Sequence, residues 1–156
     1  MSTLHLIKPT SVASGEQELT SIDAQPDKSI FVLFTSDDQT LQAMDKAAEL
    51  AKELHLGITV VAAQSVPFPL QLDEPPVPVK FIVKRFEELA ERFPEEADVR
   101  VYLCRNPLDI FKRILRVDCP AVIGIKKRKW RLFSWEEKVV RTLRRAGFCL
   151  ITVETE

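Results

Sequence analysis

The chain has 156 residues, of which 46% are hydrophobic, and this is enough for one domain around a single core. Its formal charge of -1, from 22 Lys and Arg against 23 Asp and Glu, excludes a protein drawn as a whole onto nucleic acid. Three cysteines without a Cys-x-x-Cys pair argue against a disulfide framework and a zinc site, and no apolar stretch reaches the roughly 20 residues of a membrane span, so we expect a cytoplasmic protein.

The first part of the chain, residues 1–28, is predicted to be a flexible leader. Residues 8–28 are polar, contain two prolines and show no sustained period. Leu4, Leu6 and Ile7 allow a short strand at a sheet edge, but the composition favours a mobile tail. Residues 29–156 are expected to form a single α/β domain.

An unbroken apolar run over residues 29–34 is typical of a strand that helices cover on both faces of its sheet. Ser36 followed by Gln39 fits a capping box, and apolar residues then recur at helical spacing until Gly57. Residues 58–63 are again continuously apolar. The pattern predicts a strand, a helix and a second strand.

A loop is predicted from Gln64 to about Pro78, because its five prolines disfavour both helix and strand. So long a connection is often a binding loop. A second helix is predicted from about Val79 to Phe93, where a proline follows. Apolar and polar residues alternate over 98–104, which predicts a third strand that is covered less completely and lies at a sheet edge.

Asn106 and Pro107 form a typical cap and first-turn pair for a third helix. Its predicted core face consists of Leu108, Phe111 and Leu115.

The remaining elements are a fourth strand over 121–125, a fourth helix and a last strand over 148–153. Ser134 and Glu137 fit a second capping box, and Gly147 is expected to end that helix. Its inward residues are predicted to be Val139, Val140, Leu143 and Ala146.

Five strands alternating with four helices predict a doubly wound parallel sheet, because each parallel crossover needs a covering helix. With the predicted strands numbered in chain order, the expected order is 3-2-1-4-5. Ligands of such sheets bind beyond the carboxyl ends of the strands, at the switch point, which here lies between the first and fourth strands. The expected crevice is lined by residues 35–38, the proline-rich loop and residues 126–135.

The segment after the fourth strand is basic: residues 126–145 hold nine Lys and Arg against two Glu, a local charge of +7. Phosphate-binding folds usually turn through glycines at this point, whereas here charged side chains follow the strand. The candidates for binding a nucleotide in the crevice are Thr35, Gly124, Lys126, Lys127 and Arg128.

The candidates for contact with an anionic partner are Lys129, Trp130, Arg131 and Trp135. Cations on phosphate and aromatic rings on bases would make residues 126–131 a nucleic-acid contact. The alternative, which we favour, is that the cations are solvated and the aromatic residues pack the loop onto the core. The basic run lacks a long amphipathic helix, so no membrane contact is expected.

Several stretches resemble the universal stress protein (UspA-like) family over about residues 29–153. They are Phe31-Val-Leu-Phe34, the helix Ala43–Ala51, Val101–Pro107, Ala121-Val-Ile-Gly124 and Leu143–Val153. The resemblance implies the fold and a homodimer through the final strand, Phe148 to Val153.

The ATP-binding branch of that family carries an aspartate after the first strand, and a G-x-x-G pattern followed by G-[ST] after the fourth. In this chain Thr35 stands at the aspartate, Gly124 at the first glycine, Lys127 at the second and Glu136-Glu137 at the last pair. Acidic side chains at a helix start repel phosphate. The comparison therefore implies a degenerate loop, a binding or association protein without catalysis, and no cofactor. Nucleotide binding through basic side chains, with weak ATPase activity, is the alternative.

Other reactive residues offer little support for catalysis. His5 and His55 are the only histidines, and no third group is implied that would orient either ring for a Ser/His or Cys/His pair. Histidines and cysteines lack the spacing of metal ligands. Cys104, beside Arg105, is either a low-pKa thiol or a small packing residue, and we favour the latter.

Overall fold

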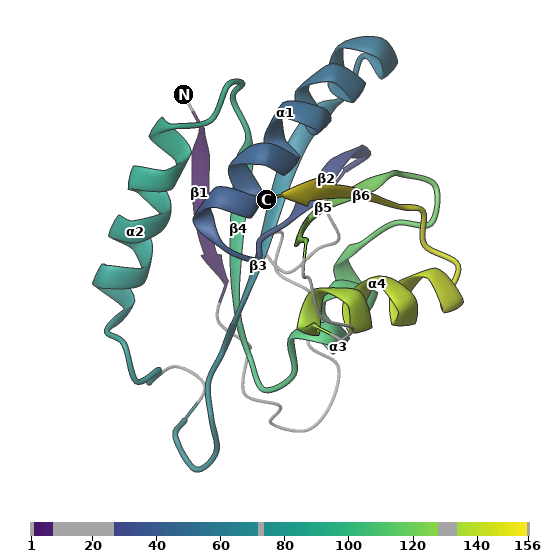
Figure 1. Cartoon of the computed structure of the whole chain (residues 1–156). Coiled ribbons are helices and arrows are strands. Elements are labelled where there is room, and N and C mark those ends of the chain that lie inside the picture. The colour runs from purple at the N-terminus through teal and green to yellow at the C-terminus, as the bar shows by residue number, and fades with distance from the viewer. Residues whose placement is uncertain (1, 8–26, 72–73, 128–133, 156) are drawn as a thin grey trace.

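A computed structural model describes residues 2–7, 27–71, 74–127 and 134–155. Strands and helices alternate from the second strand onward (Figure 1). The elements are β1 (Thr3–Ile7), β2 (Ser29–Leu33), α1 (Asp37–Leu54), β3 (Gly57–Ser65), α2 (Val79–Glu91), β4 (Asp98–Cys104), α3 (Pro107–Ile114), β5 (Ala121–Lys126), α4 (Trp135–Arg145) and β6 (Leu150–Thr155).

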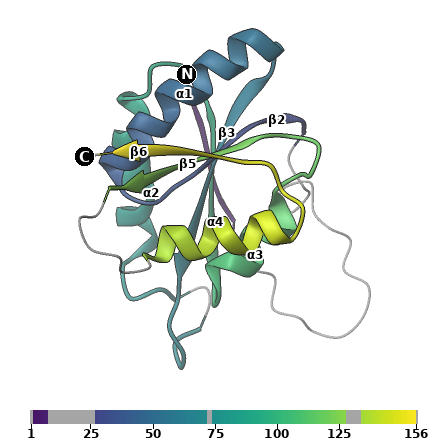
Figure 2. The same cartoon turned by 45° about the vertical axis from the view of Figure 1, so that its right-hand side comes forward.

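The six strands form one parallel sheet in the order β1-β4-β3-β2-β5-β6. The predicted order 3-2-1-4-5 is confirmed for the last five of these strands, since it corresponds to β4-β3-β2-β5-β6. Helices α1 and α2 lie on one face of the sheet, and α3 and α4 lie on the other (Figure 2). The α/β fold class predicted from the alternating pattern is therefore correct.

Each face of the sheet has its own core. On the α1/α2 face, Met44, Ile82 and Phe86 pack on alternate residues of the strands. On the other face, Phe111 and Leu143 pack on the intervening strand residues, whose side chains point to that face, such as Phe31 and Leu33. Covering both faces buries β2 completely, which explains why its sequence is continuously apolar rather than alternating.

The predicted helix starts are confirmed by their caps. Ser36 Oγ accepts the N–H of Gln39 (3.3 Å), and Ser134 Oγ accepts the N–H of Glu137 (3.2 Å). Asn106 Oδ1 accepts the N–H of Leu108 (3.1 Å). These side chains satisfy backbone donors that have no partner within the helix, so local sequence is enough to place them.

The prediction of a flexible leader over residues 1–28 is wrong for Thr3–Ile7, which form β1 at the sheet edge. The sheet therefore has six strands rather than five. Because β1 pairs with β4, the predicted edge position of residues 98–104 is also wrong. Most of the predicted leader, residues 8–26, lies outside the described residues.

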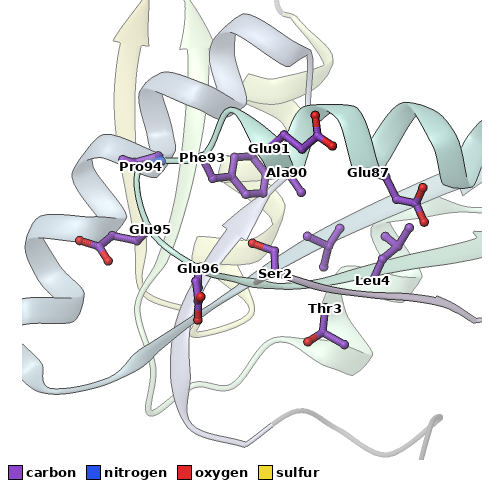
Figure 3. A pocket seen from close by; sticks show the side chains of 11 residues that line it. Ser2, Thr3, Leu4, Glu87, Ala90, Glu91, Phe93, Pro94, Glu95 and Glu96 are labelled. Carbon is purple, nitrogen blue, oxygen red and sulfur yellow. The ribbon is translucent and has the colours of Figure 1, made fainter.

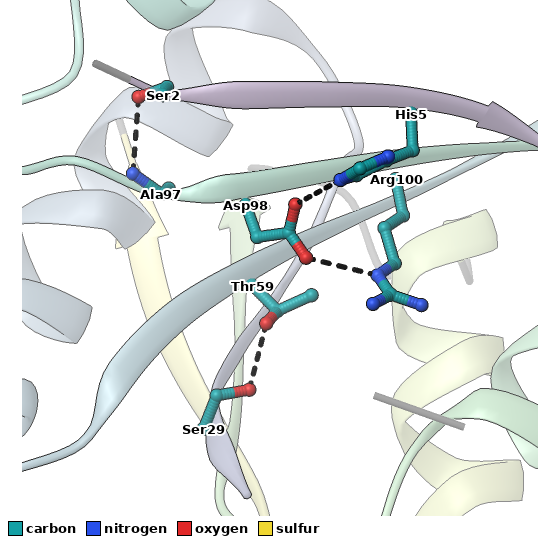
Figure 4. Close-up of polar contacts among 7 residues, drawn as sticks. All are labelled: Ser2, His5, Ser29, Thr59, Ala97, Asp98 and Arg100. Atoms are coloured by element: carbon teal, nitrogen blue, oxygen red, sulfur yellow. Dashed lines mark hydrogen bonds and ion pairs between the residues drawn. The ribbon is translucent and has the colours of Figure 1, made fainter. Parts of the chain in front are cut away.

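Polar contacts add to the backbone pairing of β1 (Figure 4). The N–H of Thr3 donates to the carbonyl of Ala97 (3.1 Å), and the N–H of Ala97 donates to Ser2 Oγ (3.1 Å). His5 Nε2 lies 3.0 Å from Asp98 Oδ1. The other carboxylate oxygen, Asp98 Oδ2, accepts a hydrogen bond from Arg100 Nε (3.1 Å). These contacts with β4 outweigh the polar composition that predicted a mobile tail.

Two boundaries also differ from the predictions. The last strand spans Leu150–Thr155 rather than 148–153, because the chain first turns through Gly147, whose φ is +97°. The N–H of Phe148 donates to the carbonyl of Leu143 (3.1 Å) and so closes the end of α4. Ala146 was predicted to face the core but is exposed at this end of the helix. Helix α2 ends at Glu91, two residues before the predicted Phe93.

Candidate functional site

The candidate site lies at the carboxyl ends of β2 and β5, where the order of the sheet reverses. From β2 the chain crosses to α1 on one face, and from β5 it crosses to α4 on the other. The two strands are hydrogen-bonded neighbours, with Val32 opposite Val122. Adjacent loops that leave toward opposite faces open a crevice in sheets of this kind, and this is the position predicted from the sequence.

Thr35 and Gly124, two of the predicted site residues, are brought together here. Thr35 Oγ1 donates to the carbonyl oxygen of Gly124 (3.4 Å). The N–H of Thr35 donates to Thr40 Oγ1 (3.2 Å) in the first turn of α1. Both the hydroxyl and the amide of Thr35 are therefore engaged within the protein.

Gly124 faces the start of α1. A Cβ atom at this position would lie 2.3 Å from the carbonyl oxygen of Gln39 and 2.9 Å from the Gln39 Cβ. Both distances are below van der Waals contact, so only glycine allows the helix to approach the strand this closely. The glycine is used for packing α1 on β5.

Asp37 lies in the first turn of α1, as predicted for a helix-start charge. Its Oδ1 is 3.2 Å from Arg85 Nη2 on α2. The guanidinium of Arg85 also lies over the ring of Phe34, 5.4 Å from its centroid, and Phe34 meets Phe86 edge to face at 4.9 Å. These contacts link the carboxyl end of β2 to α2. They also engage Asp37, which lies two residues after Thr35, the position predicted to contact a nucleoside.

Lys126 and Lys127, the described cations among residues 126–131, are both exposed. The backbone N–H of Lys127 donates to the carbonyl of Thr155 (2.8 Å), which extends the pairing of β5 and β6. That amide is therefore not free for an anion. Four further predicted site residues lie outside the described residues: Arg128, Lys129, Trp130 and Arg131.

The start of α4 is capped by its own side chains. Ser134 is 5% exposed and caps the helix, and Glu136 and Glu137 lie in the first turn. Carboxylates here interact favourably with the partial positive charge of the helix end. Trp135 is 46% exposed, and its ring lies 6.3 Å from that of Phe111 on α3. This contact agrees with the packing interpretation of Trp135.

The capping-box pattern predicts Gln39 at a helix start and does not predict that it lies against Gly124. Its Oε1 accepts from the hydroxyl of Ser36 (2.7 Å). The residue is 7% exposed, and Nε2 has no hydrogen-bond partner in the part of the chain that the structure describes. The capping-box pattern predicts the contact of Gln39 with Ser36. The burial of Gln39 depends on how closely α1 packs against β5, and no local sequence pattern reports that contact.

The proline-rich loop meets the carboxyl end of β4. Gln64 and Ser65, predicted to begin this loop, belong to β3. Arg105, just after β4, donates to the carbonyl of Val66 (2.9 Å), and its guanidinium lies 5.7 Å from the ring centroid of the exposed Phe68. These contacts place the start of the loop beside the carboxyl end of β4.

Cys104 is a packing residue, as we favoured. It is buried, and desolvation together with the nearby charge of Asp109 raises the pKa of its thiol to about 11. A thiol held in its neutral form is a poor nucleophile. Among the described residues, no group of three or more His, Cys, Asp or Glu side chains is arranged to hold a metal ion. In the same residues, no helix is both long and apolar enough to cross a bilayer.

No protein-family model and no curated protein matches the sequence. Solved structures do match. A universal stress protein from Archaeoglobus fulgidus is 17% identical, over 81% of this chain and 93% of that one, with a TM-score of 0.56.

Two further matches are comparable in identity. A macrolide-efflux protein from Streptococcus pneumoniae is 15% identical, over 100% of this chain and 52% of that one, with a TM-score of 0.54. A protein of the universal stress protein family from Burkholderia pseudomallei is 18% identical, over 86% of this chain and 98% of that one, with a TM-score of 0.48. At these identities the similarity is one of fold.

Proposed function

We propose that this chain, which has the fold of the universal stress proteins, acts in the cytoplasm by binding or association and carries out no catalysis. The observation that carries the proposal is the internal use of Gly124, where a Cβ would lie 2.3 Å from the Gln39 carbonyl oxygen. The carbonyl of Gly124 also accepts from Thr35 Oγ1, so this glycine serves contacts within the protein. The start of α4, which could hold an anion, carries Ser134, Glu136 and Glu137 instead.

Isothermal titration with ATP and AMP tests this proposal. We expect no binding of either nucleotide at millimolar concentration, since carboxylates at the start of α4 disfavour a polyanion. A Glu136→Gln/Glu137→Gln variant serves as a control for charge. Micromolar ATP binding by the natural sequence that survives Lys126→Ala/Lys127→Ala would contradict the proposal.

A second candidate function, nucleotide binding through side chains, is supported by Gln39. Its Nε2 is a buried donor without a partner among the described residues, and a buried donor of this kind favours an acceptor from a ligand or water. Lys126 and Lys127 would supply the charge. Native mass spectrometry of the purified protein is the test, because it detects a co-purified nucleotide directly. This candidate would be excluded if the purified protein carries no nucleotide and if adding nucleotides does not raise its melting temperature.

We also propose that two copies associate through β6. This strand forms one edge of the sheet and pairs only with β5 in the described part of the chain. An exposed strand edge is a template for pairing with another strand.

Contact of residues 126–131 with nucleic acid is a further candidate role of the basic segment, and such binding would weaken steeply as salt is raised.

A further inference from the structure

A pocket of about 600 Å³ lies between β1 and the end of α2, at the amino ends of the strands (Figure 3). Its volume is in the range of small-molecule sites. It lies at the opposite end of the strands from Thr35 and Gly124. The pocket depends on β1, because Ser2, Thr3 and Leu4 form one of its sides.

Part of the pocket lining is apolar. Leu4, Ala90, Phe93 and Val99 contribute to it, and Val99 is buried in the core of the α1/α2 face. The surface is therefore continuous with the core and can take the hydrocarbon part of a ligand.

The rim of the pocket is acidic. Four glutamates line it: Glu87 and Glu91 on α2, and Glu95 and Glu96 on the loop to β4 (Figure 3). Glu95 lies 3.6 Å from Lys52. Among the described residues, Glu87 and Glu91 take part in no ion pair, so these two carboxylates, rather than Glu95 and Glu96, give the rim its excess of negative charge.

The end of α2 adds to this negative field. The carboxyl end of a helix carries partial negative charge, and cations in the last turn usually balance it. The other helices follow this rule, with Lys52 in α1, Lys112 and Arg113 in α3, and Arg144 and Arg145 in α4. The last turn of α2 has no basic residue and ends in Glu91, and the exposed Arg92 that caps it does not line the pocket.

We infer that this pocket binds an organic cation with an apolar body, such as an aromatic ammonium or guanidinium compound. The apolar surface holds the body, and the carboxylates with the end of α2 hold the charge. A bare metal ion fits less well, because in the described residues no three acidic side chains converge on one point. Neutral and anionic compounds of the same shape lack the attraction to the rim.

The test uses two dyes that share a xanthene ring system, the cation rhodamine 6G and the anion fluorescein, in fluorescence anisotropy titrations. We expect rhodamine 6G to bind one site per chain and fluorescein not to bind. Raising the salt concentration should weaken rhodamine 6G binding, since the pocket is open to solvent.

Three variants locate the site. Glu87→Gln/Glu91→Gln should weaken rhodamine 6G binding about tenfold, because it removes two carboxylates and keeps the side-chain shape. Ala90→Trp should abolish binding by filling the pocket. Glu88→Gln is the matched control: it lies on the same helix, is exposed, does not line the pocket and should leave the affinity unchanged. Urea unfolding midpoints show whether each variant is folded.

The inference is overturned if rhodamine 6G does not bind at millimolar concentration, or if Glu88→Gln weakens binding as much as Glu87→Gln/Glu91→Gln does. It is also overturned if a Lys-Lys-Arg-Lys-Trp-Arg peptide, copied from residues 126–131, binds at the rim while the dye does not. The surface would then recognise a basic protein segment. None of these outcomes bears on nucleotide binding at the crevice.

Discussion

Gly124 lies where β5 packs against the first turn of α1. We predict that Gly124→Ala lowers the free energy of unfolding by about 3 kcal/mol, because the new methyl group forces the Gln39 backbone away. Urea denaturation measures this change. Gly57→Ala is the control, since a Cβ atom there would have no other atom within 4 Å, and it should change stability by less than about 1 kcal/mol. Equal effects of both substitutions would show that Gly124 is not a packing residue.

The three thiols differ in accessibility. Cys104 and Cys119 are buried, whereas Cys149 is exposed. We predict that iodoacetamide labels native protein at Cys149 alone, because the thiols in the core are shielded and burial raises the pKa of Cys104 to about 11. In a Cys149→Ser variant, mass spectrometry should detect labelling only after denaturation in urea. Rapid labelling of Cys104 in the folded variant would restore the hypothesis of a reactive thiol.

The raised pKa of Cys104 also sets the direction of a pH effect. The unfolded thiol ionises near its ordinary pKa of 9.0, and the folded thiol ionises near 11. Between these values the folded state binds more protons, so this group's contribution to stability is complete below pH 9 and falls as the pH rises toward 11.

Strand β1 is an integral part of the sheet. Ile7 is 5% exposed and belongs to the core of the α3/α4 face, with Tyr102 and Phe111. We predict that Ile7→Ala lowers the free energy of unfolding by about 3 kcal/mol, because it leaves a cavity in that core. Thr3→Ala, at an exposed position of the same strand, should change it by less than about 0.5 kcal/mol. A negligible effect of Ile7→Ala in urea denaturation would mean that β1 is not docked in solution.

The proposed dimer would form through the edge of β6. The amide of Ala121 bonds to the carbonyl of Cys149, and the amide of Lys127 bonds to that of Thr155. The odd-numbered residues of β6 therefore direct their backbone groups toward β5, and Thr152 directs its own outward. We predict that Thr152→Pro converts a dimer to a monomer, because it removes a donor at the edge without breaking the pairing with β5.

Light scattering after size-exclusion chromatography measures the mass of the assembly. The control is the circular dichroism spectrum, which should be unchanged in Thr152→Pro. A natural-sequence protein that is monomeric at all concentrations would contradict the proposed dimer.

The predicted crevice and the acidic pocket belong to opposite ends of the sheet. The predicted crevice is at the carboxyl ends of β2 and β5, and the acidic pocket lies at the amino ends of β1 and β4. The basic segment from Lys126 follows the first, and the four glutamates surround the second.

Local patterns in the sequence were enough to predict five of the strands, the four helices and the helix caps. Ser36, Asn106 and Ser134 act within one turn of the chain, and the continuous apolar runs reflect burial on both faces. The order of these five strands was predicted as the natural arrangement of a doubly wound sheet, and the structure confirms it. The meeting of Thr35 with Gly124 was predictable for the same reason.

Contacts between distant parts of the chain settled the rest. A five-residue segment has no local signal that selects pairing with β4, so the position of β1 depends on an edge that exists only once the sheet has formed. The burial of Gln39 and the need for glycine at position 124 arise where α1 meets β5. The acidic pocket brings residues 2–4 beside residues 87–99, and it required the folded structure because periodicity and capping report only on neighbours along the chain.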